Sequence, residues 1–436
     1  MLERLYSALV KRDDDAESAL PAEVRRDVPR NGLRLVAASA LQSSGDQTVN
    51  ASTVLPWLFH ALGAPPVLIG LLVPIRESGS MLPQAMLTPV VLRMKYRKHV
   101  FAAGSLVQAV AVGAMALAAA TMHGLAAGAT ILVVLAVFSL GRCLCSISSK
   151  DVQGRTVPKG ERGQINGLST TAAGLVAITL GLAIRVAGGS ELDAGELAWL
   201  LVVGLVMWVG AALLYMSVRE PADEQSDEHS SGARWLTTTW QLLRDDAPFR
   251  NFVLVRSLLL VSALSPPFVV SLSVGTGSQG LAGLGGFVIA SGVASLLGGR
   301  IFGRWADRSS RSLMSFGAAA ASAVIVVLVI AVSIPGFDGS TWWGTGIFVL
   351  GYLLLTMLHT GVRVGRKTYV VDMAEGDQRT TYVAVSNSAM GIILLIVGAI
   401  SSALAALGIP FALLFLAAMG VVGVFAGARL PDVSRG

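Results

Sequence analysis

The stretch Gly303-Arg304-Trp305-Ala306-Asp307-Arg308-Ser309-Ser310-Arg311 (GRWADRSSR) lies between two long apolar segments of the chain. It gathers three arginines and one aspartate within nine residues, while the segments 283–299 and 313–334 on either side are almost free of charge. Loops rich in Lys and Arg stay on the cytoplasmic side of a membrane. The stretch is therefore predicted to be a cytoplasmic loop that joins two membrane-spanning helices.

Outward from this loop, apolar segments recur along the whole chain. Each has about 20 residues or more, the length that a helix needs to cross a bilayer. Twelve can be drawn, at 33–60, 67–91, 100–121, 124–147, 165–186, 197–218, 249–273, 283–299, 313–334, 342–364, 382–404 and 410–429. Alternate connections contain no Lys or Arg, namely 61–66, 122–123, 187–196, 274–282, 335–341 and 405–409. This alternation predicts a multi-pass all-α protein of the plasma (bacterial inner) membrane with both termini in the cytoplasm.

The composition supports this class of protein. The chain is 53% hydrophobic and 14% charged, with a mean hydropathy of +0.67, outside the range of soluble domains. Its net charge of +6 borders the predicted membrane segments, so we interpret it as a topology signal and a contact with anionic lipid, not as a nucleic-acid surface. Cys143 and Cys145 lie two apart on one predicted helix, which supports neither a disulfide nor a metal site. No cofactor is expected.

The first 32 residues precede the first apolar segment, so no cleavable signal peptide is expected. Leu2, Leu5, Tyr6 and Leu9 follow helical spacing, which predicts a short helix lying on the inner leaflet. A second polar stretch, 219–248, separates the sixth and seventh segments; it begins acidic and Ser-rich and ends with Trp and Leu at helical spacing.

The two halves of the chain are related. At an offset of 217 residues, Lys150 falls on Lys367, and the same offset pairs Arg162 with Arg379, Ser169 with Ser386, Gly174 with Gly391 and Gly181 with Gly398. The ordered series predicts two pseudo-symmetric six-helix bundles in parallel topology. We therefore divide the chain into a cytoplasmic segment (1–32), a first bundle (33–218), a cytoplasmic linker (219–248), a second bundle (249–430) and a cytoplasmic tail (431–436).

The stretch GRWADRSSR resembles the cytoplasmic loop signature of the major facilitator superfamily: Gly, a basic residue, a bulky apolar residue, a small residue, Asp-Arg and a closing basic residue. With the twelve segments, the central linker and the repeat, the resemblance covers nearly the whole chain. It implies a secondary transporter with the major facilitator fold. Gly303, Arg304, Asp307, Arg308 and Arg311 are then expected to form a latch that holds the cytoplasmic side closed.

The chain departs from this superfamily's patterns in two places. In the corresponding loop of the first half, Met94 stands where the signature has Asp, so a latch in only one half is expected. The Gly-Pro signature of drug/proton antiporters is missing from the fifth segment. That segment and its outer end carry Gly167, Gly174, Gly181 and Gly188 at seven-residue spacing, a stripe suited to close helix packing.

Polar residues inside the membrane are costly and mark functional sites. Gln42, Asp46 and Asn50 recur every four residues in the first segment, and hence share one helix face. The second segment contains the remaining members of the predicted site, Arg76, Glu77 and Gln84. We expect Asp46, Arg76 and Glu77 to meet near the midplane as a substrate and proton-coupling site, with either carboxylate as the proton carrier. The alternative is an ion pair that only joins the two helices.

Other intramembrane residues are weaker candidates. Arg142 resembles the superfamily's arginine of the fourth segment that is linked to proton coupling, with an inner gate or snorkelling as alternatives. Arg256 is expected to add positive potential to the cavity. His359 can titrate near neutral pH or serve as a packing residue. Arg363 is expected to snorkel to the cytoplasmic surface. Pro266 and Pro267 occupy the place of Asp46 in the repeat and predict a hinge or gate, or else a static kink.

The leading hypothesis is a secondary transporter that works by rocker-switch alternating access. No P-loop motif is present, so an ion or substrate gradient must supply the energy. Arg76, Arg142 and Arg256 favour proton-coupled transport of a small polar, anionic solute, with coupling in the first half and the substrate pocket shaped by the second. The alternative is proton-driven efflux of an amphipathic or drug-like compound. An enzyme is not expected, nor is a non-transporting receptor; the expected partners are the solute, protons and the lipid bilayer, and the expected state is a monomer.

Overall fold

The computed structural model describes residues 2–10, 17, 22–187, 194–222, 234–277, 281–373 and 378–431. These residues are almost entirely helical, and no strand occurs within them. The helices are α1 (Leu2–Leu9), α3 (Ala22–Arg25), α4 (Val28–Thr48), α5 (Val54–Ala61), α6 (Pro66–Met81), α7 (Gln84–Leu92), α8 (Arg97–Thr121), α9 (Gly124–Thr156), α10 (Lys159–Ala187), α11 (Ala194–Met216), α12 (Arg234–Asp245), α13 (Ala247–Leu258), α14 (Val261–Gly275), α15 (Leu281–Arg308), α16 (Ser310–Ser333), α17 (Trp342–Met373), α18 (Gln378–Leu407) and α19 (Ile409–Ala428).

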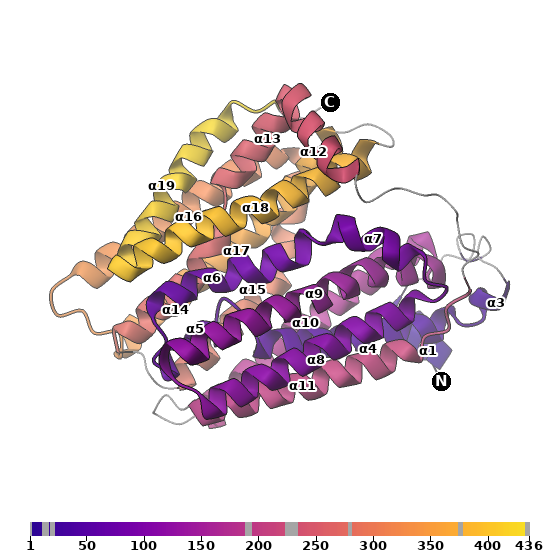
Figure 1. The fold of residues 1–436 in the computed structure, drawn as a ribbon, viewed down its shortest axis with the longest axis horizontal. Helices are drawn as coiled ribbons and strands as arrows, with labels where there is room; N and C mark the ends of the chain where they lie inside the picture. Colours follow the sequence, from indigo (N-terminus) through magenta and orange to yellow (C-terminus); the bar gives the residue numbers. More distant parts are fainter. Residues whose placement is uncertain are drawn as a thin grey trace.

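The helices form two bundles, in agreement with the predicted all-α architecture. The first half, α4 to α11, lies below the second half, α13 to α19, in Figure 1. Both chain ends lie toward the right of that view, and we call this end of the molecule the terminal side. Within the described residues, nine helices are long and apolar enough to cross a bilayer. The count of twelve spans therefore stays a prediction.

Three of the predicted spans are not single helices. Span 33–60 is α4 and α5, and the break between them contains an Asn50 side chain that accepts a hydrogen bond from Ser52 N at 2.8 Å. Such a local turn competes with the helical backbone ladder. Span 67–91 breaks before Pro83, which has no N–H to continue the ladder.

Span 249–273 is also interrupted, at Leu259–Leu260 between α13 and α14. Pro266 and Pro267 lie inside α14, both buried, six and seven residues beyond Leu260. The break thus lies before the two prolines, and the hinge or kink expected at Pro266 and Pro267 stays a prediction. The three breaks place irregular backbone beside the interface between the halves, where it does not face lipid.

The halves meet through glycines that the sequence repeat pairs. In α10, a methyl group on Gly181 would lie 2.7 Å from Ile289 N in α15, so only glycine permits this approach. Its repeat partner in α18, Gly398, lies in the same way against Pro74 of α6. The predicted glycine stripe is confirmed at Gly174 and Gly181; Gly167 faces open space, and Gly188 falls outside the described residues.

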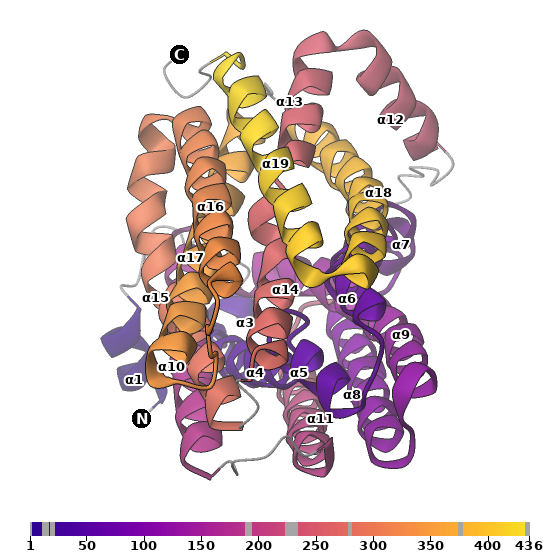
Figure 2. The same cartoon turned by 90° about the vertical axis from the view of Figure 1, so that its left-hand side faces the viewer.

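The halves also touch directly at the end opposite the terminal side, which faces the viewer in Figure 2. His60 in α5 lies 2.6 Å from Ser271 Oγ in α14. Trp57, fully buried, packs against Phe287 of α15 with ring centroids 5.9 Å apart, and Phe287 in turn contacts Tyr352 of α17 at 5.3 Å. These side chains close the opposite side between the halves.

The terminal side of the first half is held together by its own polar contacts. Asn31 accepts from Arg219 N at 3.0 Å and donates to Arg219 O at 2.9 Å. The two carboxylate oxygens of Glu220 accept from Arg97 N and Lys98 N at the start of α8. A carboxylate at a helix N-terminus satisfies donors that have no intrahelical partner.

The N-terminal helix α1 packs against protein, whereas the sequence predicted that it would lie on the membrane surface. Tyr6 is 1% exposed, fits against Gly32 of α4 and donates from its hydroxyl to the buried Glu161 at the start of α10. Amphipathic spacing alone cannot distinguish a lipid surface from a protein groove. Packing against protein is favoured over a lipid surface here, because the protein groove also supplies an acceptor for the tyrosine hydroxyl.

The stretch GRWADRSSR is more helical than its signature suggested. Gly303 to Arg308 continue α15, and only Ser309 separates it from α16, whose N-terminus Ser309 caps by accepting from Ser312 N at 3.2 Å. Arg308 is exposed, and Arg311 donates to Leu430 O at 2.9 Å. The side chains of Gly303, Arg304 and Asp307 fall outside the described part, so the latch stays a prediction.

Candidate functional site

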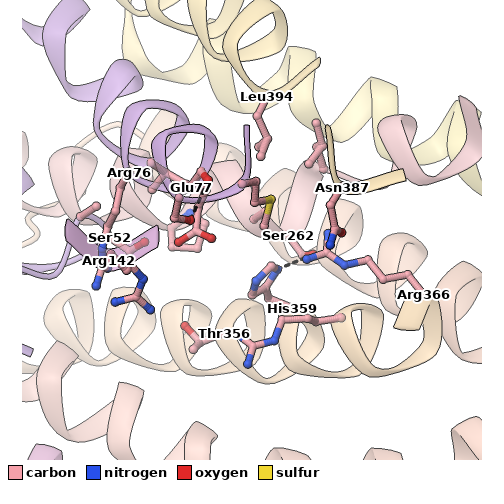
Figure 3. Close-up of a pocket in the computed structure, with 18 of the residues that line it drawn as sticks. Ser52, Arg76, Glu77, Arg142, Ser262, Thr356, His359, Arg366, Asn387 and Leu394 are labelled. Atoms are coloured by element: carbon pink, nitrogen blue, oxygen red, sulfur yellow. Dashed lines mark hydrogen bonds between the residues drawn. The ribbon is translucent and has the colours of Figure 1, made fainter. Parts of the chain in front are cut away.

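A cavity of about 730 Å³ lies between the two halves. It is bounded on the opposite side by the contacts of α5 with α14, and exposed Lys150 and Lys367 line it toward the terminal side. Seven basic side chains and two carboxylates line it: Arg76, Arg142, Lys150, Arg256, Arg363, Arg366 and Lys367, with Asp46 and Glu77. Figure 3 shows Arg76, Glu77 and Arg142 on one side of it and His359, Arg366 and Asn387 on the other.

Asp46 is the centre of the first half's charge cluster. Arg142 Nη1 donates to both of its oxygens, at 2.6 and 2.7 Å, and Arg76 Nη2 donates to Oδ1 at 2.8 Å. The carboxylate thus joins three elements, α4, α9 and α6. A carboxylate between two guanidinium groups is strongly held in its ionised form.

Glu77 differs from Asp46 in its surroundings. It lines the cavity and is half-buried, and its carboxylate makes no ion pair or hydrogen bond to any residue that the structure describes. Two neighbouring carboxylates therefore occupy different environments. One is paired with arginines, and the other lines the cavity without an ionic partner among the described residues.

One face of α17, in the second half, lines the cavity across from Asp46 and Glu77. Tyr352, Thr356, His359, Arg363, Arg366 and Val370 line the cavity at spacings of three and four residues, and Lys367, four residues after Arg363, lines it too. This spacing is that of a single helix face. His359 Nδ1 lies 3.5 Å from Ser262 Oγ of α14, a long contact. Arg366 Nε is buried and has no hydrogen-bond partner among the described residues.

Arg256 approaches the cavity from α13 and is 6% exposed. It donates to Ser386 Oγ at 2.6 Å and to Asn387 Oδ1 at 3.0 Å, both in α18. These partners are neutral, and Arg256 Nε has none in the described part of the chain. The guanidinium charge is thus positioned without being neutralised.

The structure brings together most of the residues that the sequence singled out. Asp46, Asn50, Arg76, Glu77, Gln84, Arg142, Arg256, Pro266 and His359 all line the cavity, whereas Gln42 and Pro267 are not among its lining residues. The prediction that Gln42, Asp46 and Asn50 share one helix face was wrong, because α4 ends at Thr48. Asn50 reaches the cavity from the break that follows.

Sequence reasoning missed the basic face of α17. Arg363, expected to snorkel to the cytoplasmic surface, is exposed and lines the cavity, and Arg366 and Lys367 lie beyond the predicted end of that span at residue 364. Two signals pointed to them: their spacing from His359, and the repeat that pairs Lys150 with Lys367. Both lysines line the cavity.

The chemistry of the site is that of charge recognition. Groups of three or more His, Cys, Asp or Glu side chains that would hold a metal ion do not occur among the described residues. What the cavity offers is an excess of guanidinium and ammonium donors, which recognise carboxylate and phosphate oxygens.

Comparison with known structures shows the same fold. The D-xylose-proton symporter aligns with a TM-score of 0.71 at 13% identity, over 92% of this chain and 98% of that one. The nucleoside transporter NupG aligns with a TM-score of 0.64 at 14% identity, over 92% and 98%. A POT family transporter in complex with a thioalcohol-conjugated peptide gives 0.66 at 11% identity, over 91% and 95%. Their different substrates leave the substrate of this chain open.

At the level of sequence, comparison with curated proteins gave no match. A family model does match, over residues 36–364, which is more than half of the chain. The match spans α5 to α16 and most of α4 and α17, and therefore both halves of the fold and both walls of the cavity. The chain belongs to the Major Facilitator Superfamily.

Proposed function

We propose that this protein is a proton-coupled secondary transporter of a small polar, anionic solute. One observation carries the substrate class: the cavity between the halves is lined by seven basic side chains and two carboxylates. A cavity with one sign of charge concentrates ions of the other sign. Such a lining suits an anion and disfavours a lipophilic cation, the cargo of the drug-efflux alternative.

Glu77 is the better proton carrier of the two carboxylates. Asp46 accepts three hydrogen bonds from Arg76 and Arg142, and a proton would have to displace them. Glu77 lines the cavity without a described partner, so it can exchange a proton with cavity water. In this proposal Asp46 positions the arginines and Glu77 carries the coupling proton.

The contacts between the halves support alternating access. The His60–Ser271 contact and the Trp57–Phe287 pair close the opposite side, while exposed Lys150 and Lys367 line the cavity toward the terminal side. With both termini in the cytoplasm, this arrangement is the inward-facing state. The bundles 33–218 and 249–430, linked by 219–248, would rock about the glycine contacts between α10 and α15 and between α6 and α18.

The substrate class is tested by thermal unfolding of the purified protein with matched panels of organic anions and lipophilic cations, at mildly acidic and mildly alkaline pH. A ligand of the folded state raises the melting temperature by mass action. We expect anions to stabilise the protein. Stabilisation by lipophilic cations alone contradicts the proposal and favours efflux.

Proton coupling is tested with the stabilising anion in proteoliposomes under an imposed pH gradient. Glu77→Gln is expected to lose accumulation driven by the gradient while anion exchange persists. Glu196→Gln, an exposed carboxylate at the start of α11, serves as the matched control. Wild-type accumulation by Glu77→Gln would show that Glu77 does not carry the proton.

A further inference from the structure

We infer that the anion binds to the second half of the cavity, around Arg366 and Arg256, and that it is a small organic dianion, with two carboxylates or one phosphate monoester. This inference rests on the proposed function and deepens it. The sequence placed Arg76 in a predicted substrate and coupling site and expected the second half to shape the substrate pocket. The contacts of the basic side chains point to the second half.

The arginines of the first half already have an anionic partner. Asp46 takes the hydrogen bonds of both Arg76 and Arg142 that face it, and Glu77 lies on the same wall. Counted with Lys150, this wall has three positive and two negative groups. A solute anion would have to compete with Asp46 for the same guanidinium groups, and therefore gains little there.

The wall formed by the second half has no such partner. Arg256, Arg363, Arg366 and Lys367 contribute four positive charges, and none of its described lining residues is a carboxylate. Arg256 is more than nine-tenths buried and held by neutral groups, with Nε unpaired. The Arg366 side chain donates no hydrogen bond to a described residue, and its Nε is buried. Buried donors without acceptors are costly, and a bound oxyanion removes that cost.

The excess of positive charge on the wall of the second half indicates how many negative charges the solute carries. Like charges on one helix face repel one another, and residues three or four apart have Cβ atoms only about 5–6 Å apart. A single negative charge would leave most of the repulsion among Arg363, Arg366 and Lys367 in place. Two negative charges separated by a few bonds engage Arg366 and a second basic group at once, so a dianion gains more than a monoanion.

The inference is tested by measuring the affinity of the purified full-length protein for four probes of similar size: succinate, glycerol 3-phosphate, propionate and glycerol. We expect at least one of the two dianions to bind about tenfold or more tightly than propionate, and glycerol not to bind. Arg366→Gln should weaken the dianion about tenfold, the effect of losing a charge-assisted hydrogen bond. Arg366→Lys should restore part of the loss. The relative affinity of succinate and glycerol 3-phosphate distinguishes a dicarboxylate from a phosphate site.

Arg250→Gln is the matched control, because Arg250 is exposed on the same helix as Arg256 and donates only to carbonyls of α12. Since Arg366 has no described partner, its substitution should leave the fold intact, which the melting temperature without ligand verifies. If Arg366→Gln and Arg256→Gln bind dianions as the wild type does while Arg76→Gln does not, the site lies in the first half and the inference is wrong. Equal affinity for propionate and both dianions also overturns it, with the proposed function still standing. If no anion binds the wild type, the proposed function itself fails.

Discussion

Arg142 and Asp46, 96 residues apart in the chain, form a two-point contact in which one guanidinium nitrogen donates to both carboxylate oxygens at 2.6 and 2.7 Å. The contact joins α9 to α4 beside the break that ends α4, and Arg76 of α6 completes it. The side chains of Asp46 and Arg142 are 19% and 31% exposed, so water screens the pair only in part. Three helices of the first half therefore share one electrostatic centre.

This centre predicts strong coupling between Asp46 and Arg142. A double-mutant cycle of Asp46→Asn, Arg142→Gln and the double variant should give an interaction free energy of about 1–3 kcal/mol in thermal or denaturant unfolding. Asp46→Asn leaves the Arg142 charge without its partner, and Arg142→Gln leaves Asp46 with Arg76 alone, so the double variant should be less destabilised than the sum of the two. Additive effects, with a coupling below about 0.5 kcal/mol, would show that the pair does not hold the helices together.

The glycine contact between α10 and α15 predicts opposite effects for two substitutions in one helix. A methyl group on Gly181 would meet Ile289 N at 2.7 Å and Gly285 O at 2.9 Å, atoms of backbone that cannot rotate away. Gly181→Ala should destabilise the protein by about 1–3 kcal/mol. Gly167→Ala meets nothing within 4 Å and should stabilise by about 0.5–1 kcal/mol, because alanine favours the helix. The melting temperature should fall in Gly181→Ala and rise in Gly167→Ala. Equal changes in the two variants would contradict the close approach of α10 to α15.

The burial of Tyr6 predicts that this side chain provides most of the attachment of α1 to the first half. Tyr6→Ala removes a fully buried ring, a change that costs about 3–5 kcal/mol in a core. The helix should therefore undock and unwind, so that trypsin can cut the backbone after the already exposed Arg4 without unfolding of the bundle. Tyr6→Phe keeps the ring and loses only the bond to Glu161, so it should be cut at an intermediate rate. Exposed Ser7→Ala is the control, and equal trypsin cleavage of all three variants would mean that α1 is not docked through Tyr6.

Charge alternation and apolar length were sufficient to predict the fold class, because both follow directly from the cost of placing charge and unpaired backbone in lipid. The repeat was informative in finer detail: the pairs Gly174–Gly391 and Gly181–Gly398 lie at two equivalent contacts between the halves. The breaks in the spans were not predicted. They depend on side-chain hydrogen bonds such as that of Asn50, which no hydropathy window represents.

The candidate site was predicted less completely than the fold. Asp46, Arg76 and Arg142 stood out because a charge in the middle of an apolar segment is conspicuous. Arg366 and Lys367 did not, since a basic residue near the end of a segment has the same sequence pattern whether it snorkels to lipid headgroups or lines a cavity. Only the direction in which the face of α17 points decides between the two, and that direction is a property of the packed bundles.

The contact between His60 and Ser271 predicts that closure of the opposite side can be trapped chemically. Nε2 and Oγ lie 2.6 Å apart across the two halves, so cysteines at both positions should be joined by a short bifunctional thiol reagent. The two native cysteines, Cys143 and Cys145, are buried, which leaves the introduced pair as the accessible thiols. Cross-linking should abolish transport, since the halves must separate here for the cavity to open on this side, and reduction of a cleavable linker should restore it. Either single cysteine variant, treated in the same way, should keep its transport rate. Full transport by the cross-linked double variant would mean that the two halves do not part at this contact during the cycle.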